Sequence, residues 1–411
     1  MKKVLIYGMA VLVIIFLLPF ICDADSAQVL PKGVFSLDTT FFYYLDIDQR
    51  YDPDGNTEDI AADYNAELNS GVFDDLSVLD PFVGGTASIG HSVVDFTLVY
   101  RTFELIFSYG LTDKFSVGLL VDYTHIKRKV GARLDTSSAN VGKSVAGNTL
   151  APLDPNMGVE PLTTEDVQDL LGNGLDINGD GTPEIEGYGY DRVETWSESG
   201  ICDIELIGKY MFLENKKWRL AFSGGFRLPT GDSDNPDSLV DVGFGDGQTD
   251  ILFRLHTDFV GVKKFLFNTT IRYDLQLPDK EELRVSEDVN LPLTGNKEKV
   301  DRDLGDIMEF EIMGNYSFTK QFSGGLKYRF TKKFKDDIDG NRGYNYTSLE
   351  DETDSASHIF FITLGYSTVQ QYLNKTFPVP LSAAITYRNR FAGKNNVYKA
   401  RYFSLNFAVY F

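Results

Sequence analysis

RYFSLNFAVYF, residues 401–411, alternates strictly between large apolar side chains and small or polar ones. One face carries Phe403, Leu405, Phe407, Val409 and Phe411, and the other carries Tyr402, Ser404, Asn406, Ala408 and Tyr410. A repeat of two residues is the period of a β-strand whose two faces meet different surroundings. The segment therefore predicts a strand with one oily face and one polar face.

The same alternation recurs along the chain, as where Phe310 and Ile312 alternate with Glu309 and Glu311. The chain holds 31 Phe and 22 Tyr among 411 residues, and aromatic side chains favour strands. Counting such segments predicts twelve strands, near 34–46, 94–109, 115–129, 201–213, 218–230, 248–259, 265–277, 306–318, 322–333, 357–369, 380–391 and 399–411. We therefore expect an all-β fold of antiparallel strands.

The joins between these strands alternate in length. Short joins lie at 111–114, 214–217, 261–264 and 319–321. The long joins are acidic: residues 47–92 carry ten Asp or Glu against one Arg, and residues 131–197 carry twelve against three Lys or Arg. Such segments cannot bury enough apolar surface to form cores, so we expect long solvated loops. Short turns at one end and long loops at the other are typical of a transmembrane up-and-down β-barrel.

The N-terminal residues resemble a secretory signal peptide. Lys2 and Lys3 precede an apolar run over 4–21, and Ala24 and Ser26 are small residues at the two cleavage positions. We expect a signal peptide over 1–26 and a single barrel domain over 27–411, with a retained membrane anchor as the alternative. Cleavage would remove one of the two cysteines, so no intramolecular disulfide is expected.

Export together with two-faced strands favours the outer membrane of a Gram-negative bacterium. A bilayer holds no water for a free sheet edge, so the first and last strands should pair and close the barrel. Aromatic residues flank the short joins, as in an interfacial girdle: Tyr109, Phe115, Phe212, Trp218, Phe259, Phe265, Phe318 and Phe322. The alternative is a soluble periplasmic β-sandwich. The formal net charge of −21 argues against a nucleic-acid partner.

The polar face would line the lumen, and it carries both signs of charge. We expect Glu309 and Glu311 near Lys327 and Arg329. We also expect Asp203 and Glu205 near Arg219 and Arg227. Most of these pairs should brace the wall, since a lone charge there carries a large desolvation cost; the alternative is a charged constriction that selects solutes. Candidate solute-contacting residues are Arg388 and Arg390, which lack an acidic partner on the last strand, then Arg219, Arg227, Arg254, Arg272, Lys327, Arg329, Glu309, Glu311, Asp203 and Glu205.

Both long loops carry further candidates. Loop 47–92 contains apolar residues and is a candidate plug for the barrel, with a surface lid as the alternative. Segment 176–186 resembles the first half of a calcium loop. Its candidate ligands for Ca²⁺ are Asp176, Asn178, Asp180 and Glu184. The twelfth position of this loop is Gly187 where a bidentate Glu is usual, so an acidic, glycine-rich turn is the alternative. No other cofactor is expected.

The sequence favours no enzymatic activity. Twelve-stranded outer-membrane enzymes exist, including a phospholipase with His and Ser two residues apart on one strand. At that spacing His125 is followed by Lys127, and His256 is followed by Asp258. The sequence contains no Gly-x-Ser-x-Gly motif and no phosphate-binding loop. A surface hydrolase is therefore the least favoured function.

Four motifs resemble those of a family of outer-membrane transporters named after a phenol-degradation pathway. They are Leu30–Phe35 (LPKGVF), Tyr109–Gly118 (YGLTDKFSVG), Ser199–Ile204 (SGICDI) and Leu228–Asp232 (LPTGD). The resemblance covers the first 260 residues best, and Cys202 stands where the family usually has Gly. It implies a porin-like barrel that takes up small, often aromatic or hydrophobic compounds, and it supplies no catalytic residues.

We therefore expect a passive outer-membrane channel or transporter for small solutes. The alternative is a closed structural or adhesion barrel whose acidic loops bind calcium or bridge lipopolysaccharide. The expected partners are outer-membrane lipid and lipopolysaccharide, a small-molecule solute, and the barrel-assembly machinery, which recognises C-terminal aromatic residues such as Phe411.

Overall fold

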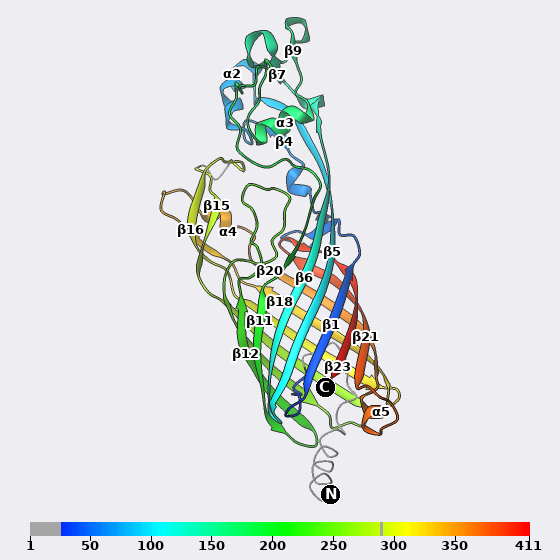
Figure 1. Cartoon of the computed structure of the whole chain (residues 1–411). Coiled ribbons are helices and arrows are strands. Elements are labelled where there is room, and N and C mark those ends of the chain that lie inside the picture. Colours follow the sequence, from blue (N-terminus) through cyan, green and yellow to red (C-terminus); the bar gives the residue numbers. More distant parts are fainter. Residues whose placement is uncertain (1–25, 288–290) are drawn as a thin grey trace, which may run out of the picture.

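A computed structural model describes residues 26–287 and 291–411 of the chain. Residues 1–25, which hold most of the predicted signal peptide, lie outside the described residues. Twelve antiparallel strands in the described residues form a barrel (Figure 1). They are β1 (Phe35–Tyr44), β5 (Ser88–Thr112), β6 (Phe115–Asp135), β11 (Ile204–Glu214), β12 (Trp218–Leu228), β13 (Asp250–Phe259), β14 (Phe265–Gln276), β17 (Ile307–Ser317), β18 (Phe322–Lys333), β20 (Ser355–Ser367), β21 (Leu381–Lys394) and β23 (Arg401–Tyr410). All twelve strands predicted from the sequence are confirmed.

The first and last barrel strands close the sheet. β1 pairs with β5 on one side and with β23 on the other, so that Leu37 lies opposite both Phe107 and Val409. Every other barrel strand pairs with two barrel neighbours in the same way, β6 joining β11 over Phe115–Leu120. Closure satisfies the backbone groups that an open edge would expose.

The period-two pattern places the oily face outside and the polar face inside. The outward side chains of Leu326, Leu364 and Phe407 are 65%, 59% and 54% exposed, whereas the inward Asp250 and Asp258 are fully buried. A soluble sandwich would bury the oily face, so the barrel prediction is confirmed over that alternative. Among the described residues, no helix has the length and apolarity to cross a bilayer.

Aromatic side chains gather at the turn end of the barrel. Trp218 and Phe259 lie 4.7 Å apart between ring centroids, and Phe318 and Phe322 are each more than half exposed. These side chains point outward beside the short turns, as the sequence predicted. The expected alternation of short joins at the turn end with long joins at the loop end has one exception. Join 368–380 at the turn end, with helix α5 (Val369–Leu373), is longer than join 395–400 at the loop end.

The hairpin of β5 and β6 extends beyond the barrel and carries a cap of loop segments at its tip (Figure 1). Loop 45–87 and loop 136–203 pack together there around a buried cluster that includes Leu68, Phe73 and Leu170. The short elements of loop 45–87 are β2 (Gln49–Tyr51), β3 (Thr57–Asp59), β4 (Glu67–Asn69), α2 (Asp80–Val83) and the 3₁₀ turns Ala62–Tyr64 and Asp74–Leu79. Those of loop 136–203 are β7 (Val141–Ser144), β8 (Thr149–Pro152), β9 (Val159–Glu160), α3 (Thr164–Leu171), β10 (Trp196–Ile201) and the 3₁₀ turns Thr136–Ser138, Val145–Gly147 and Pro155–Met157.

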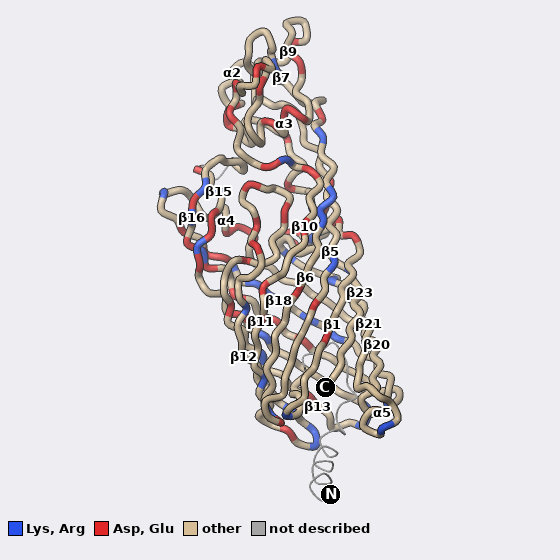
Figure 2. The backbone as a smooth tube through the Cα atoms, in the orientation of Figure 1, with Lys and Arg blue, Asp and Glu red and all other residues tan. Residues whose placement is uncertain are grey.

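Two later loops form a second group beside the cap. β15 (Asp279–Arg284), β16 (Lys297–Asp303) and β19 (Asp337–Asp339) make a three-stranded sheet beside helix α4 (Thr347–Glu350). β22 (Val397–Tyr398) pairs with β2 near the barrel mouth. Figure 2 shows many of the acidic residues in these loops above the barrel.

Candidate functional site: the barrel lumen

One side of the lumen holds a dense cluster of ion pairs. Its members are Glu205, Arg227, Asp250, Arg254, Arg272 and Asp274, from β11, β12, β13 and β14. Glu205 lies 2.9 Å from Arg227, 2.8 Å from Arg254 and 3.3 Å from Arg272, measured between charged atoms. Alternation puts every second residue of adjacent strands on the inner face, which brings these side chains together. The expected Glu205–Arg227 contact is confirmed.

The next two strands along the wall hold a second cluster. Glu311 lies 3.2 Å from the Lys327 ammonium and also contacts Arg329, while Glu309 lies 3.4 Å from Arg329. These contacts between β17 and β18 confirm the sequence expectation. Strand register places Arg272 opposite Glu309, so the two clusters adjoin.

Arg388 continues this band of charge through aromatic contacts. Its guanidinium carbon lies 4.7 Å from the Phe42 ring centroid, 5.2 Å from that of Phe361 and 5.3 Å from that of Tyr402. Aromatic faces stabilise a guanidinium electrostatically. We call the band the charged belt, and its residues are Glu205, Arg227, Asp250, Arg254, Arg272, Asp274, Glu309, Glu311, Lys327, Arg329 and Arg388.

An apolar cluster covers the belt on the loop side. This mouth cluster comprises the buried residues Ile47, Ile60, Ala61, Phe96, Leu98, Ile126, Val193, Val240, Phe244, Ala400 and Tyr402. Tyr402 stacks on Tyr44 with ring centroids 4.1 Å apart, and it also contacts Arg388, so the cluster and the belt are contiguous. Arg390 lies at this level and donates to the Tyr398 carbonyl at 2.9 Å.

The N-terminal segment, residues 26–30, lies against the inner wall at the turn end. Ala27 is fully buried, and its N–H donates to Asp258 at 3.2 Å. The Ser26 hydroxyl donates to the same carboxylate at 2.7 Å, and Lys209 donates to the Ser26 carbonyl at 2.9 Å. Nothing in the sequence indicates this contact, because the residues that follow a signal peptide carry no pattern that specifies a position inside a barrel.

A tight turn links that segment to the wall. The Val34 N–H donates to the Pro31 carbonyl, and Gly33 between them has φ of +81°, which favours glycine. Gly33 also donates to the Gly110 carbonyl at 2.8 Å, and a Cβ on Gly110 would meet the Pro31 oxygen at 2.1 Å. Two of the four motifs in the sequence therefore form a single turn-end contact.

The other two motifs meet at the loop end. Asp203 accepts hydrogen bonds from the backbone N–H groups of Thr230 and Gly231 at 3.0 and 2.9 Å. The expected approach of Asp203 to Arg219 is wrong, because the register of β11 on β12 puts Arg219 opposite Glu214, at the far end of the strand. Arg219 instead lies 3.7 Å from Asp258 and outside the charged belt.

Loop 45–87 covers the barrel from outside, so the interpretation of loop 47–92 as a plug is wrong and the lid alternative holds. Its apolar residues Phe73 and Leu76 pack in the cap, against side chains of loop 136–203. Ile47, Ile60 and Ala61 contribute to the mouth cluster. Many apolar side chains of the loops pack against one another, and the charged belt remains on the lumen wall.

Two histidines lie beside serines, which the sequence spacing did not show. His256 Nε2 lies 2.7 Å from the Ser223 hydroxyl, and both residues are at most 1% exposed inside the wall. His125 Nδ1 lies 2.8 Å from the Ser199 hydroxyl at an exposed position between β6 and β10. The inner pair is out of reach of a substrate while it stays buried, and it braces adjacent strands.

The candidate calcium ligands are partly brought together. Carboxylate atoms of Asp176, Asp180 and Glu184 lie within 4.8 Å of one another. Asp176 also accepts backbone N–H groups of Gly179 and Gly181, and Asn178 donates to Glu184 at 2.5 Å. Oxygen donors of this kind suit Ca²⁺. Calcium binding here stays a prediction.

Comparisons with known proteins agree with this architecture. Residues 162–353 match the family model described as "Putative MetA-pathway of phenol degradation". The COG4313 outer membrane channel from Pseudomonas putida F1 is similar over 95% of this chain and 100% of its own, with 13% identity and a TM-score of 0.53. No curated protein matches the chain.

Two further solved structures are less similar. A Pseudomonas aeruginosa FadL homologue covers 92% of this chain and 90% of its own at 10% identity, with a TM-score of 0.35. The β domain of the Bordetella autotransporter BrkA is similar over 92% of this chain and 100% of its own, at 8% identity and with a TM-score of 0.39. Neither similarity carries an argument about function. The chain is thus an outer-membrane-type β-barrel, and its residues 162–353 match the family model named after the phenol-degradation pathway.

Proposed function

We propose that the protein is a passive outer-membrane channel for small solutes, including hydrophobic or aromatic ones. The observation that carries the proposal is the charged belt. Eleven charged side chains line the wall of a closed barrel whose outer face is apolar. A barrel that serves only as an anchor needs no such lining, and polar interiors are typical of channels.

Two barriers bound the proposed path. The mouth cluster lies between the belt and the loops, and the N-terminal segment lies between the belt and the turn end. Entering the apolar mouth costs a solute of low polarity less free energy than it costs an ion, since burial of an unpaired charge is costly. This difference favours uncharged solutes of low polarity.

Planar-bilayer recording and uptake by proteoliposomes test the proposal. Refolded protein should give discrete conductance steps and should accelerate entry of an uncharged aromatic such as phenol over protein-free liposomes. Heat-denatured protein, incorporated in the same amount, is the control. The absence of both conductance and uptake by correctly folded barrel would contradict the proposal.

The closed adhesion barrel is the second candidate, and the acidic group of Asp176, Asp180 and Glu184 favours it. In this alternative, divalent cations on the loops bridge lipopolysaccharide. Terbium luminescence, displaced by calcium and lost in Asp180→Asn, combined with absent conductance, would support it over the channel. Asp154→Asn, at a partly buried position away from this group, is a control on the same loop.

A hydrolase function rests on the two His–Ser pairs alone. The His256–Ser223 pair is buried inside the wall, out of reach of a substrate, and the COG4313 structure to which the fold is similar is described as a channel. Ester hydrolysis by the intact barrel that is lost in Ser199→Ala or Ser223→Ala would support this candidate. We expect no such activity.

The proposed function implies several partners. Lipid would contact the apolar outer face, and the aromatic residues at the turn end would lie at the inner interface. Phe411, 71% exposed, ends the closing strand, where its N–H donates to the Phe35 carbonyl at 2.8 Å. The barrel-assembly machinery is the proposed reader of this C-terminal strand.

A further inference from the structure

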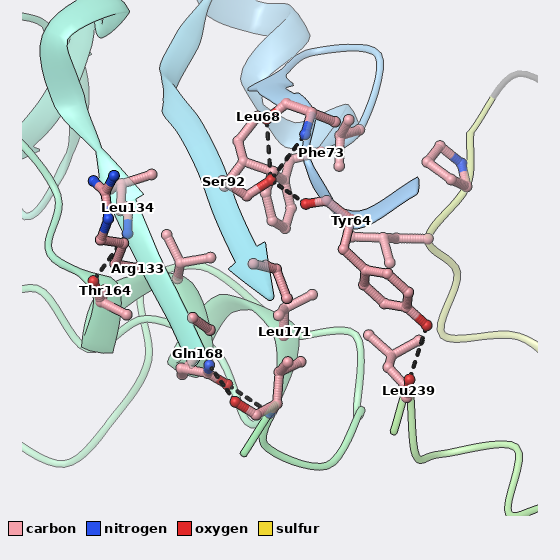
Figure 3. Close-up of a pocket in the computed structure, with 18 of the residues that line it drawn as sticks. Tyr64, Leu68, Phe73, Ser92, Arg133, Leu134, Thr164, Gln168, Leu171 and Leu239 are labelled. Atoms are coloured by element: carbon pink, nitrogen blue, oxygen red, sulfur yellow. Dashed lines mark hydrogen bonds between the residues drawn. The ribbon is translucent and has the colours of Figure 1, made fainter. Parts of the chain in front are cut away.

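A cavity of about 310 Å³ lies between the cap and the mouth cluster, outside the barrel lumen. Loop 45–87, the projecting ends of β5 and β6, and helix α3 supply most of its wall (Figure 3). Apolar side chains dominate the lining, among them Leu68, Phe73, Val94, Leu134, Val167 and Leu171. Ligand sites are typically concave and mostly apolar, and their volumes begin near about 300 Å³.

The polar atoms of the wall already have partners within the protein. The Tyr64 hydroxyl donates to the Leu239 carbonyl at 2.8 Å, and the Ser92 hydroxyl donates to the Tyr64 carbonyl at 2.6 Å (Figure 3). Gln168 bonds to both backbone groups of Val193. A ligand therefore has few polar groups to satisfy here, so recognition rests on apolar area and shape.

The charges of the cavity stand at its rim. Asp63 and Arg133 line it but are exposed, and Asp63 pairs with Arg50 at 2.6 Å. An ion entering the apolar part would leave this solvated rim and lose hydration without a partner. The cavity thus disfavours charged ligands.

The walls are held in place before any ligand arrives. Helix α3 begins with a capping box in which Thr163 and Asp166 bond reciprocally, and Lys143 pairs with Asp166 at 2.8 Å. The cavity also adjoins the lumen entrance, because Tyr64 and Val193 belong to both its lining and the packing of the mouth cluster. Preorganised walls reduce the free-energy cost of binding.

We propose that this cavity is a capture site for one uncharged, hydrocarbon-like molecule of one or two rings. A cavity of about 150 Å³ lined by aliphatic side chains suffices for benzene, so about twice that volume accommodates a bicyclic compound. The inference deepens the proposed channel function by adding a site outside the lumen that holds the solute before passage. Binding at the cavity and flux through the barrel are separate measurements.

Naphthalene titrated into the full chain in lipid nanodiscs tests the capture site. We expect saturable binding above the linear partition into empty nanodiscs, with one site per barrel. 2-Naphthalenesulfonate, which adds a charge to the same rings, should bind at least about tenfold more weakly, because its charge would be buried without a partner. Absence of saturable naphthalene binding to folded protein overturns the proposal.

The Ala132→Phe variant tests the cavity directly, because Ala132, on β6, is one of its lining residues. The added ring should fill the space and lower naphthalene affinity by about tenfold or more. Ala146→Phe, the same change at an exposed cap position, should leave affinity unchanged. Unchanged binding in Ala132→Phe also overturns the proposal. If that variant fails to fold, the smaller Ala66→Leu change fills the same cavity.

The two functional proposals fail in different ways. Saturable, Ala132-dependent binding without solute uptake would support the capture site and contradict the channel. Uptake without saturable binding would support the channel and contradict the capture site.

Discussion

Glu205 shows how single residues balance the interior of this barrel. It contacts Arg227, Arg254 and Arg272 within 3.3 Å and is only 6% exposed. Three guanidinium groups surround this one carboxylate, so the local net charge depends on it. The sequence predicted one of these contacts, with Arg227, because only adjacent strands can be paired by pattern alone.

Glu205→Gln should make the lumen more attractive to anions. The change leaves three guanidinium groups with one fewer negative partner, and it should also lower the free energy of unfolding by about 3 kcal/mol or more. Reversal potentials in a salt gradient measure the shift. Glu198→Gln, an equal charge change on the exposed β10, is the control and should leave selectivity unaltered. Equal selectivity in the two variants would contradict a role of the belt in ion passage.

Asp166 makes the cap sensitive to acid. Burial opposes its ionisation, but hydrogen bonds from Lys143 and Thr163 outweigh burial and hold the pKa of the carboxyl below its ordinary 3.8. A lowered folded-state pKa gives stability that is complete above that ordinary value and lost as pH falls through the folded pKa. Hydrogen exchange of α3 amides, corrected for intrinsic rates, should therefore accelerate towards about pH 3.

Asp166→Asn should weaken protection of α3 at neutral pH and remove most of this pH dependence. Asp169→Asn, on the same helix with a half-exposed side chain, should retain the acid response. An identical pH profile in Asp166→Asn and the unmodified protein would assign the response to another group.

At the scale of elements, the N-terminal segment and the projecting hairpin depart most from a simple barrel. Alternation predicted the strands within a few residues, yet β5 and β6 extend to Ser88 and Asp135, beyond the predicted bounds. Their extra length is stabilised by packing of the cap, where the buried Ala87 and Ile89 contact residues of both loops. Contacts between distant loops leave no periodic trace in either segment, so the sequence predicted solvated loops there.

Asp258→Ala should increase single-channel conductance by releasing the N-terminal segment. The substitution removes the carboxylate that accepts the Ala27 N–H. Asp113→Ala is the control, because it removes only the exposed contact to the Lys32 N–H. Ala27→Asp, which sets two carboxylates against each other, should raise conductance without altering the wall. Unchanged conductance in both Asp258→Ala and Ala27→Asp would show that the segment does not obstruct the lumen.

At the scale of the whole molecule, the two tryptophans lie near opposite ends of the barrel and can report the surroundings of each end. Trp218 lies on the outer face at the turn end and is 42% exposed, while Trp196 packs beside the mouth cluster in β10. Brominated lipids should therefore quench the emission of Trp218 in a Trp196→Phe variant. They should quench Trp196 much less in a Trp218→Phe variant. Equal quenching of the two would contradict the assignment of the barrel to the bilayer and the cap to water.

The amino-acid sequence by itself determined the barrel, because alternation, turn length and the cost of unpaired backbone in lipid are local or general constraints. It also predicted the Glu311–Lys327 and Glu311–Arg329 contacts, which follow from the order of neighbouring strands. Only the tertiary structure decided the apolar mouth, the lumenal position of residues 26–30 and the cavity beside α3. Each of these depends on segments far apart in the chain meeting in space, and their apolar and hydrogen-bonding surfaces specify a partner only once the barrel has brought them together.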